Sequence, residues 1–218
     1  MALGSLVLVD GWNHFLAVQR CFGYATASSF PLDRLARHLS AEAGAGDVDD
    51  VVVVMALPNR NHPGELPEFH AWRRRLNKLR NFGVRHEKAR FSYHELACAG
   101  CRTTLDRQVA CPSCGRSNPV AGRRKEKGAD IRLATLALDG AWRQDYTALI
   151  VLSQDSDFGP MIRQVKEIHQ RQGRRYALYS SFPVCTRPEH EHRKIPGTRD
   201  LPLDADVYKA LAEKPFGA

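Results

Sequence analysis

Residues 50–57 read Asp-Val-Val-Val-Val-Met-Ala-Leu, a continuous apolar run with four consecutive valines. β-Branched residues favour strands, and an uninterrupted apolar run is typical of a strand that is covered on both faces. Pro58 and Asn59 follow directly and end the run. The segment therefore predicts an interior strand of a parallel sheet.

Strand-like and helix-like patterns alternate on both sides of this run. Further strands are predicted at 5–9, at 84–93 (polar, and therefore expected at a sheet edge), at 147–153 and at 174–182. Apolar residues at helical spacing predict helices at 32–43, 66–82, 129–141, 158–172 and 203–213. Residues 183–202 are predicted to form a loop. This alternation indicates an α/β fold with a mostly parallel sheet and helices on both faces.

Length and composition limit the class of protein. A chain of 218 residues accommodates one large domain with a small insertion, and a hydrophobic fraction of 43% is too high for a disordered chain. No apolar run approaches the roughly 20 residues that span a bilayer, and the N-terminal run lacks the flanks of a signal peptide. We therefore expect a cytoplasmic protein with no membrane association.

The positive charge is concentrated in one segment. Residues 73–127 hold 15 Lys and Arg and 4 Asp and Glu, a net charge of +11, whereas the whole chain carries +8 and the remainder therefore −3. A basic segment on a mildly acidic body suggests a polyanionic partner such as nucleic acid, with an Arg-rich solvated surface as the alternative. The same two interpretations apply to the arginine-rich run at 73–80.

Four aspartates stand where the predicted fold presents ligands. Asp10 and Asp155 directly follow predicted strands, Asp130 opens the helix at 129–141, and Asp157 lies two residues after Asp155. Ligands of open α/β sheets bind beyond the carboxyl ends of the strands. Clustered carboxylates need a compensating cation or a proton, and Mg²⁺ and Mn²⁺ prefer such oxygen ligands. The sequence predicts a Mg²⁺ or Mn²⁺ site formed by Asp10, Asp130 and Asp155.

Each aspartate except one also has a structural interpretation. Asp10 with Gly11 can form a turn, and Asp130 can cap a helix. Asp157 is a good cap for the next helix, because the proline at 160 then falls in the first turn, where its missing N–H costs nothing. Asp155 has no comparable structural role and ranks as the strongest ligand.

Three motifs resemble those of the NYN domains, a branch of the PIN-like nucleases. They are VDGWN at 9–13, KGAD at 127–130 and SQDSDFGPMI at 153–162, present in the family's order over most of the chain. The third is the most specific. The resemblance implies a PIN-like Rossmannoid fold over residues 1–218 and a Mg²⁺- or Mn²⁺-dependent ribonuclease activity.

The resemblance also assigns roles to individual residues. The acidic catalytic set would be Asp10, Asp130, Asp155 and Asp157. Asn13 would orient Asp10 or contact a substrate phosphate. Lys127 would contact the phosphate backbone and Ser153 would support the acids, with a solvated charge and a strand-end hydroxyl as the respective alternatives.

Two CxxC pairs predict a zinc site. Cys98 with Cys101 and Cys111 with Cys114 provide four thiolates, which suit tetrahedral structural Zn²⁺ and leave no open position for catalysis. A disulfide is not expected in a reducing compartment. For the same reason Cys21 is expected to be an unpaired thiol.

The cysteines lie in a basic insertion, predicted at 94–122. Arg123 and Arg124 follow it and are expected to contact substrate. We expect a zinc-ribbon arm that binds nucleic acid and delivers it to the carboxylates; a staple for a long loop and a protein-docking surface are the alternatives.

Two functions of different classes follow. The first is a metal-dependent endoribonuclease that cuts single-stranded or structured RNA. The second is a catalytically silent module that binds RNA or protein on the same fold. A phosphatase of the haloacid dehalogenase type is disfavoured, because Trp12 occupies the position of its second aspartate.

Overall fold

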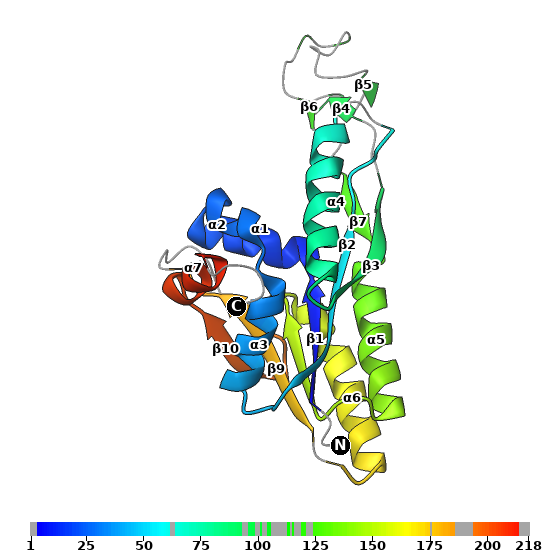
Figure 1. The fold of residues 1–218 in the computed structure, drawn as a ribbon. Helices are drawn as coiled ribbons and strands as arrows, with labels where there is room; N and C mark the ends of the chain where they lie inside the picture. The colour runs from blue at the N-terminus through cyan, green and yellow to red at the C-terminus, as the bar shows by residue number, and fades with distance from the viewer. Residues whose placement is uncertain are drawn as a thin grey trace.

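A computed structural model of the chain describes residues 4–61, 64–92, 124–174, 176–185 and 194–213. Between 93 and 123 it describes only residues 96–98, 101, 104–105, 113, 115 and 119–120. The described residues form one seven-stranded sheet in the order β10-β9-β8-β1-β2-β3-β7 (Figure 1). Its strands are β1 (Ser5–Asp10), β2 (Val48–Ala56), β3 (Val84–Ser92), β7 (Lys125–Lys127), β8 (Ala148–Leu152), β9 (Ala177–Pro183) and β10 (Arg199–Leu203). A second, small sheet has the order β5-β4-β6, with β4 (Leu96–Cys98), β5 (Thr104–Leu105) and β6 (Pro119–Val120).

Helices cover both faces of the large sheet, in which every neighbouring pair except β3 and β7 is parallel. On one face lie α1 (Gly11–Phe22), α2 (Tyr24–Ser29), α3 (Leu32–Glu42), α4 (Leu66–Arg80) and α7 (Ala205–Glu213). On the other lie α5 (Ala129–Arg143) and α6 (Gly159–Arg171). The α/β prediction is confirmed.

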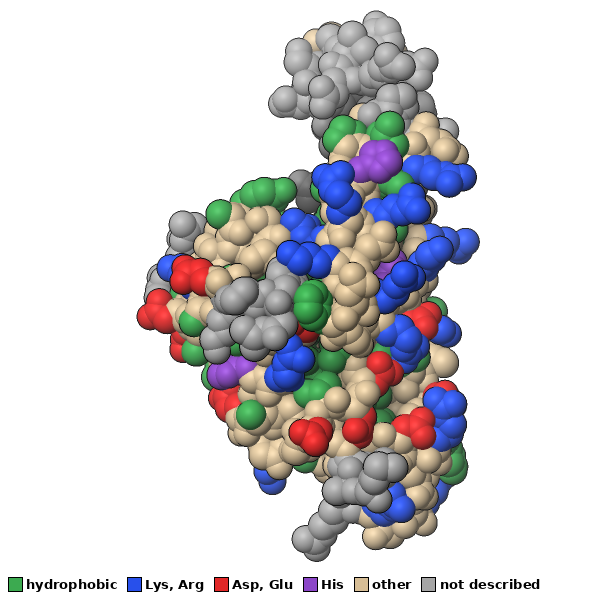
Figure 2. All heavy atoms as spheres, in the orientation of Figure 1, with side chains coloured by type: hydrophobic (Ala, Val, Ile, Leu, Met, Phe, Trp, Pro, Cys, Tyr) green, Lys and Arg blue, Asp and Glu red, His purple; other side chains and the backbone are tan. Residues whose placement is uncertain are grey.

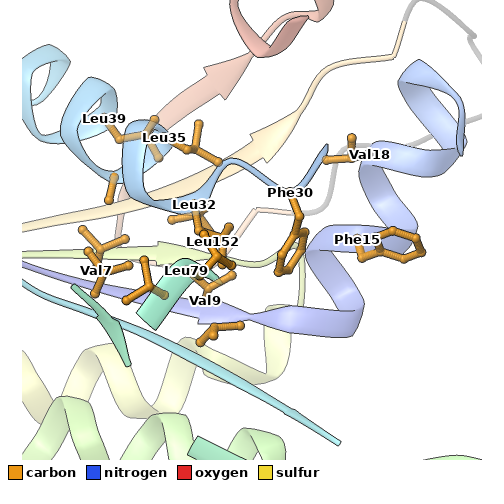
Figure 3. Packing of buried hydrophobic residues seen from close by; sticks show 14 of the residues in the cluster. Val7, Val9, Phe15, Val18, Phe30, Leu32, Leu35, Leu39, Leu79 and Leu152 are labelled. Carbon is orange, nitrogen blue, oxygen red and sulfur yellow. The ribbon is translucent and has the colours of Figure 1, made fainter. Parts of the chain in front are cut away.

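Alternate residues of β1 serve the two hydrophobic cores. Val7 and Val9 pack into the core on the α3 side, which Figure 3 shows together with Phe15 and Phe30. Leu6 and Leu8 pack into the core under α5 and α6. A strand buried on both faces needs apolar residues at every position, so the continuous apolar runs predicted these interior strands.

Two elements depart from the sequence predictions at the sheet edges. β10 lies in the predicted loop at 183–202 except for its last residue, Leu203. Among the described strands it pairs only with β9, so Pro202 stands on an edge strand, where its missing N–H is tolerated. The predicted edge strand at 84–93 is β3, but β7 pairs with its last residues, from Arg90 to Ser92. Both β7 and β10 are too short and polar to show a strand pattern.

Helix α1 replaces the turn considered at Asp10 and Gly11. It begins at Gly11, immediately after β1, and Asp10 is its N-cap. A Cβ atom at position 11 would lie 2.7 Å from the Cβ of Met55 on β2, which is closer than such atoms approach. Glycine therefore allows the helix to start against the sheet without an intervening loop.

The expectation that Cys21 is an unpaired thiol is wrong. Cys21 of α1 forms a disulfide with Cys185, which follows β9, and their Cα atoms are 4.7 Å apart. Helix α1 packs against β9, and the Cys21 sulfur lies 3.8 Å from the carbonyl oxygen of Pro183 at the end of that strand. The two cysteines are 164 residues apart in sequence, so only the folded sheet brings them together.

Candidate active site

Asp10 is buried at the carboxyl end of β1, with only 5% of its surface exposed. The backbone N–H of Asn13 donates to its Oδ1 (3.4 Å), and the Ser153 hydroxyl donates to its Oδ2 (3.2 Å). Asp10 therefore caps helix α1, a role that the sequence suggests for Asp130 and Asp157 instead, and it also contacts the loop after β8. Both carboxylate oxygens are held, so its orientation is fixed.

Asn13 and Ser153 fasten the loop after β8 to β1 and α1. The Asn13 side-chain oxygen accepts a hydrogen bond from the backbone N–H of Gln154 (3.2 Å). The Ser153 hydroxyl accepts one from the N–H of Asp155 (3.1 Å) while it donates to Asp10. Ser153 thus links two of the predicted acids directly, and the Asn13 side chain positions the segment that carries Asp155.

The sequence predicts Asp157 as a helix cap, but in the structure the capping residue is Asp155. The Asp155 Oδ1 accepts from the N–H of Asp157 (2.9 Å) and caps the 3-10 helix η1 (Ser156–Phe158). Helix α6 starts after η1, at Gly159, with Pro160 in its first turn. Because η1 precedes α6, the capping aspartate lies two residues before the position predicted from Pro160. Asp155 therefore has a structural role, and Asp157 is exposed.

Asp130 is not the cap of α5. That position belongs to Gly128, whose φ of +85° lies in the left-handed region that favours glycine. Asp130 lies in the first turn, as the second residue of the helix. Partial burial and the charges of Asp155 and Asp157 raise its pKa, against the opposing charge of Lys125. These influences place Asp130 among the other acids.

Glu126 is a fifth acid that the sequence analysis missed. Its carboxylate accepts a hydrogen bond from the backbone N–H of Ala56, at the end of β2. Burial, together with the charges of Asp10 and Asp130, raises its pKa to about 7. It was hidden within the basic run RRKEK, yet strand alternation gives a signal: Lys125 and Lys127 are exposed, whereas Glu126 between them is half-buried.

These five residues, Asp10, Glu126, Asp130, Asp155 and Asp157, form the acid cluster. Burial raises the pKa of Asp10 to about 7, and the charges of Asp130 and Asp155 add to the effect; the hydrogen bonds from Asn13 and Ser153 oppose it. A carboxylate with such a pKa lacks the counter-charge that would keep it ionised. The cluster offers oxygen ligands alone, the set preferred by Mg²⁺ and Mn²⁺.

The predicted metal triad is not assembled as a ligand set. Within the described ranges, no three His, Cys, Asp or Glu side chains stand close enough to hold a metal ion as they are placed. The electrostatic influence of Asp130 and Asp155 on Asp10 shows that the three carboxylates are neighbours. Mg²⁺ retains several waters and often takes only one or two protein carboxylates, so these neighbours fit such an ion.

A sequence profile of the NYN domain matches residues 6–181. The chain belongs to the NYN domain family. NYN domains are generally nucleases that use divalent metals and act on RNA. The match includes all three motifs and every member of the acid cluster.

Comparisons with individual proteins add little to the family assignment. No curated protein matches the sequence. A solved structure of a protein of unknown function from Vibrio parahaemolyticus is 17% identical to this NYN domain, with 82% of each chain covered and a TM-score of 0.41. In the described part of the chain, no helix is both long and apolar enough to cross a membrane.

The basic residues expected to bind substrate differ in their surroundings. Lys127 is exposed on β7. Arg124 pairs with Glu68 and with Glu65 (3.4 Å) of the segment that begins α4, and its guanidinium lies 4.6 Å from the ring centroid of Phe91. In this NYN domain Arg124 therefore fixes the returning chain against α4. Arg123 lies outside the described residues.

The predicted zinc site falls largely outside the described residues. Cys111 and Cys114 are not among them, and Cys98 is described only as part of strand β4. Cys101 is exposed. Zinc ligation by these cysteines stays a prediction.

Proposed function

We propose that this NYN domain is a metal-dependent endoribonuclease that hydrolyses RNA phosphodiester bonds. The observation that carries the proposal is the acid cluster, in which Asp10 is buried beside Asp130 and Asp155 with a pKa of about 7. Asp10 is buried next to two further carboxylates, an arrangement that is costly when all three are ionised, and a divalent cation offsets that cost. RNA then provides the polyanionic partner of a protein with net charge +8.

Asp10, Asp130 and Asp155 would hold Mg²⁺ or Mn²⁺. When bound, the cation supplies positive charge that stabilises the phosphodiester during attack by water. Ser153 and the Asn13 N–H hold Asp10 in one orientation, and the bond from Asp157 N–H holds Asp155. Preset carboxylates lose little conformational entropy when they take up a ligand.

Glu126 is suited to proton transfer. Its pKa of about 7 allows it to gain or lose a proton near neutral pH, which is the condition for a general base. The hydrogen bond from Ala56 N–H holds its carboxylate beside Asp10 and Asp130. We propose that Glu126 removes a proton from the attacking water and that Asp157 supports the neighbouring acids.

The insertion at 94–122 is proposed to be a zinc-ribbon arm. Cys98, Cys101, Cys111 and Cys114 would hold structural Zn²⁺, because two CxxC pairs supply the four thiolates of a tetrahedral site. The arm enters after β3 and returns at β7, one residue before Glu126. A basic arm attached at that point can bring single-stranded or structured RNA to the acid cluster.

The decisive experiment compares RNA cleavage in Mn²⁺ by the wild type and by Asp155→Asn. We expect a loss of at least about 100-fold, because one charge of the cation site is removed. Asp206→Asn, an exposed aspartate of α7, is the matched control and should cleave within about twofold of the wild type. Equal cleavage by wild type and Asp155→Asn contradicts the proposal. RNA binding without cleavage by the wild type instead supports the silent binding module.

A further inference from the structure

A second polar surface lies between α4 and β3, separate from the acid cluster. Here the structure has a groove with a volume of about 830 Å³. Figure 2 shows Lys and Arg side chains along this side of the molecule. The described residues that line it include four arginines, one lysine and one histidine, and no acidic residue. We call this surface the basic groove.

The sequence builds the basic groove from two regular patterns. On α4, Phe69, Arg73 and Arg80 follow one another at intervals of four and seven residues and share one stripe of the helix. On β3, His86 and Lys88 alternate with Arg85 and Glu87, and so share a face of the strand. The His86 ring is held at the groove wall by a hydrogen bond with the Met55 carbonyl (3.0 Å).

Most of the positive charge in the basic groove is uncompensated. Arg85 is neutralised by Asp50 (2.6 Å) and Glu87 (2.8 Å). In contrast, no acidic side chain of the described residues forms an ion pair with Arg73, Arg80 or Lys88. All three are exposed. Their charges therefore attract an anion from outside the chain.

The spacing of the arginines favours a polymer. Arg73 and Arg80 are seven residues apart on α4, or about 10 Å along the helix axis at 1.5 Å per residue. Two guanidinium groups at that separation contact different phosphates of a chain. Each can bind a phosphate with two parallel hydrogen bonds. Phe69 and His86 add aromatic surfaces on which unpaired bases can stack.

We propose that the basic groove binds the sugar-phosphate backbone of single-stranded RNA as an exosite beside the acid cluster. The groove starts at Leu57, the residue after Ala56, whose N–H binds Glu126 of the acid cluster. A strand held in the groove therefore reaches the acid cluster around the carboxyl end of β2. That this RNA is the substrate rests on the proposed function; the binding itself does not.

The test uses the full chain with Arg73→Glu and Arg80→Glu combined. Binding of a fluorescent single-stranded RNA of mixed sequence is measured by anisotropy in EDTA, where no cleavage occurs, at several salt concentrations. We expect at least about tenfold weaker binding and a salt dependence shallower by about 1.4, at about 0.7 per lost phosphate contact. The control, Arg163→Glu with Lys166→Glu on exposed positions of α6, should bind within about twofold of the wild type.

Further measurements separate the possible outcomes. Unchanged RNA affinity in the groove variant overturns the exosite. Displacement of the bound RNA by polyglutamate as strong as its displacement by unlabelled RNA also overturns it and points to an acidic protein partner. Lys88→Glu provides an independent charge reversal, and a thermal melt confirms that each variant folds.

Cleavage in Mn²⁺ distinguishes the two proposals. If the wild type cleaves, the groove variant should show a raised KM and an unchanged kcat. If the wild type binds RNA through the groove but does not cleave, the exosite stands and the proposed nuclease fails. If it cleaves and the groove variant has the same KM, the nuclease stands and the exosite fails.

Discussion

The acid cluster and the basic groove each gather charges of one sign, but at different depths. In the acid cluster, burial raises the pKa values of Asp10 and Glu126 to about 7, so the carboxylates lose part of their charge near neutral pH. In the basic groove, Arg73 and Arg80 are exposed and keep their charge in water. A buried carboxylate such as Asp10 therefore suits a small cation, whereas exposed guanidinium groups suit a large polyanion.

The largest effect should come from an amide within the acid cluster. Asp130→Asn removes a charge and should lower kcat about 1,000-fold, or about 4 kcal/mol, while RNA affinity in EDTA changes less than twofold. Single-turnover cleavage and anisotropy measure the two quantities. Asp139→Asn, exposed on the same helix, is the control and should change neither. Weaker RNA binding by Asp130→Asn would show that the acid cluster also contributes to RNA affinity, so that cleavage and binding are not divided between the two surfaces.

The next effect concerns the disulfide that ties α1, and with it Asn13, to β9. Cys21→Ser should lower the free energy of unfolding by about 3 kcal/mol, because a crosslink between distant residues restricts the unfolded chain. Urea denaturation measures the change. Cys185→Ser should cost the same, and the double variant no more. RNA binding in the basic groove should persist under conditions in which the variant is folded. Identical stability of wild type and Cys21→Ser would contradict this contribution.

A smaller effect is the pH dependence of stability without divalent cations. The pKa of Asp10 rises from 3.8 in the unfolded chain to about 7 in the fold, so the folded protein binds this proton more tightly. Stability is therefore greatest below about pH 4 with respect to this group and falls as pH rises toward 7. The shift sets a limit of about 4 kcal/mol, and we expect about half of it.

Denaturation in EDTA from pH 4 to pH 8 measures this trend. Asp10→Asn should remove about half of it, because the raised pKa of Glu126 adds a trend of the same sign, whereas the groove variant of Arg73 and Arg80 should keep it. A trend that survives unchanged in Asp10→Asn would assign the pH dependence to other groups.

The smallest effect tests the acid that the sequence analysis missed. Glu126→Gln keeps an oxygen for the Ala56 N–H and should lower kcat about tenfold, or about 1.4 kcal/mol. The variant should also change the dependence of the rate on pH, because one of the titrating acids of the cluster is removed. Glu213→Gln, an exposed glutamate of α7, is the matched control and should change neither quantity. A wild-type pH profile in Glu126→Gln would exclude proton transfer by this residue.

The interior of the fold was predictable from the sequence because buried parallel strands need apolar residues at every position. The runs around Val52 and Ile150 show this directly. Short edge strands carry no such pattern, so β7 and β10 were missed. The disulfide was missed because proximity between Cys21 and Cys185 arises only from the packing of α1 on β9.

The candidate site was predictable in position but not in detail. The order of strands predicts that Asp10 and Asp155 share one edge. It does not predict that Asp155 caps a 3-10 turn, or that Gly128 and not Asp130 occupies the cap position of α5. The role of Glu126 could be recognised only from the pairing of β7 with β3, because that pairing places a residue of a basic run beside the acids.

The antiparallel pairing of Ser92 with Lys125 has a consequence for the evolution of this family member. The insertion leaves and rejoins the sheet at adjacent positions of one ladder, so the two ends stay together whatever connects them. Segments of different length and target preference can be exchanged at this point without a change in the core. Diversification of such chains is therefore expected between β3 and β7, with the sheet edge that carries the acid cluster kept constant.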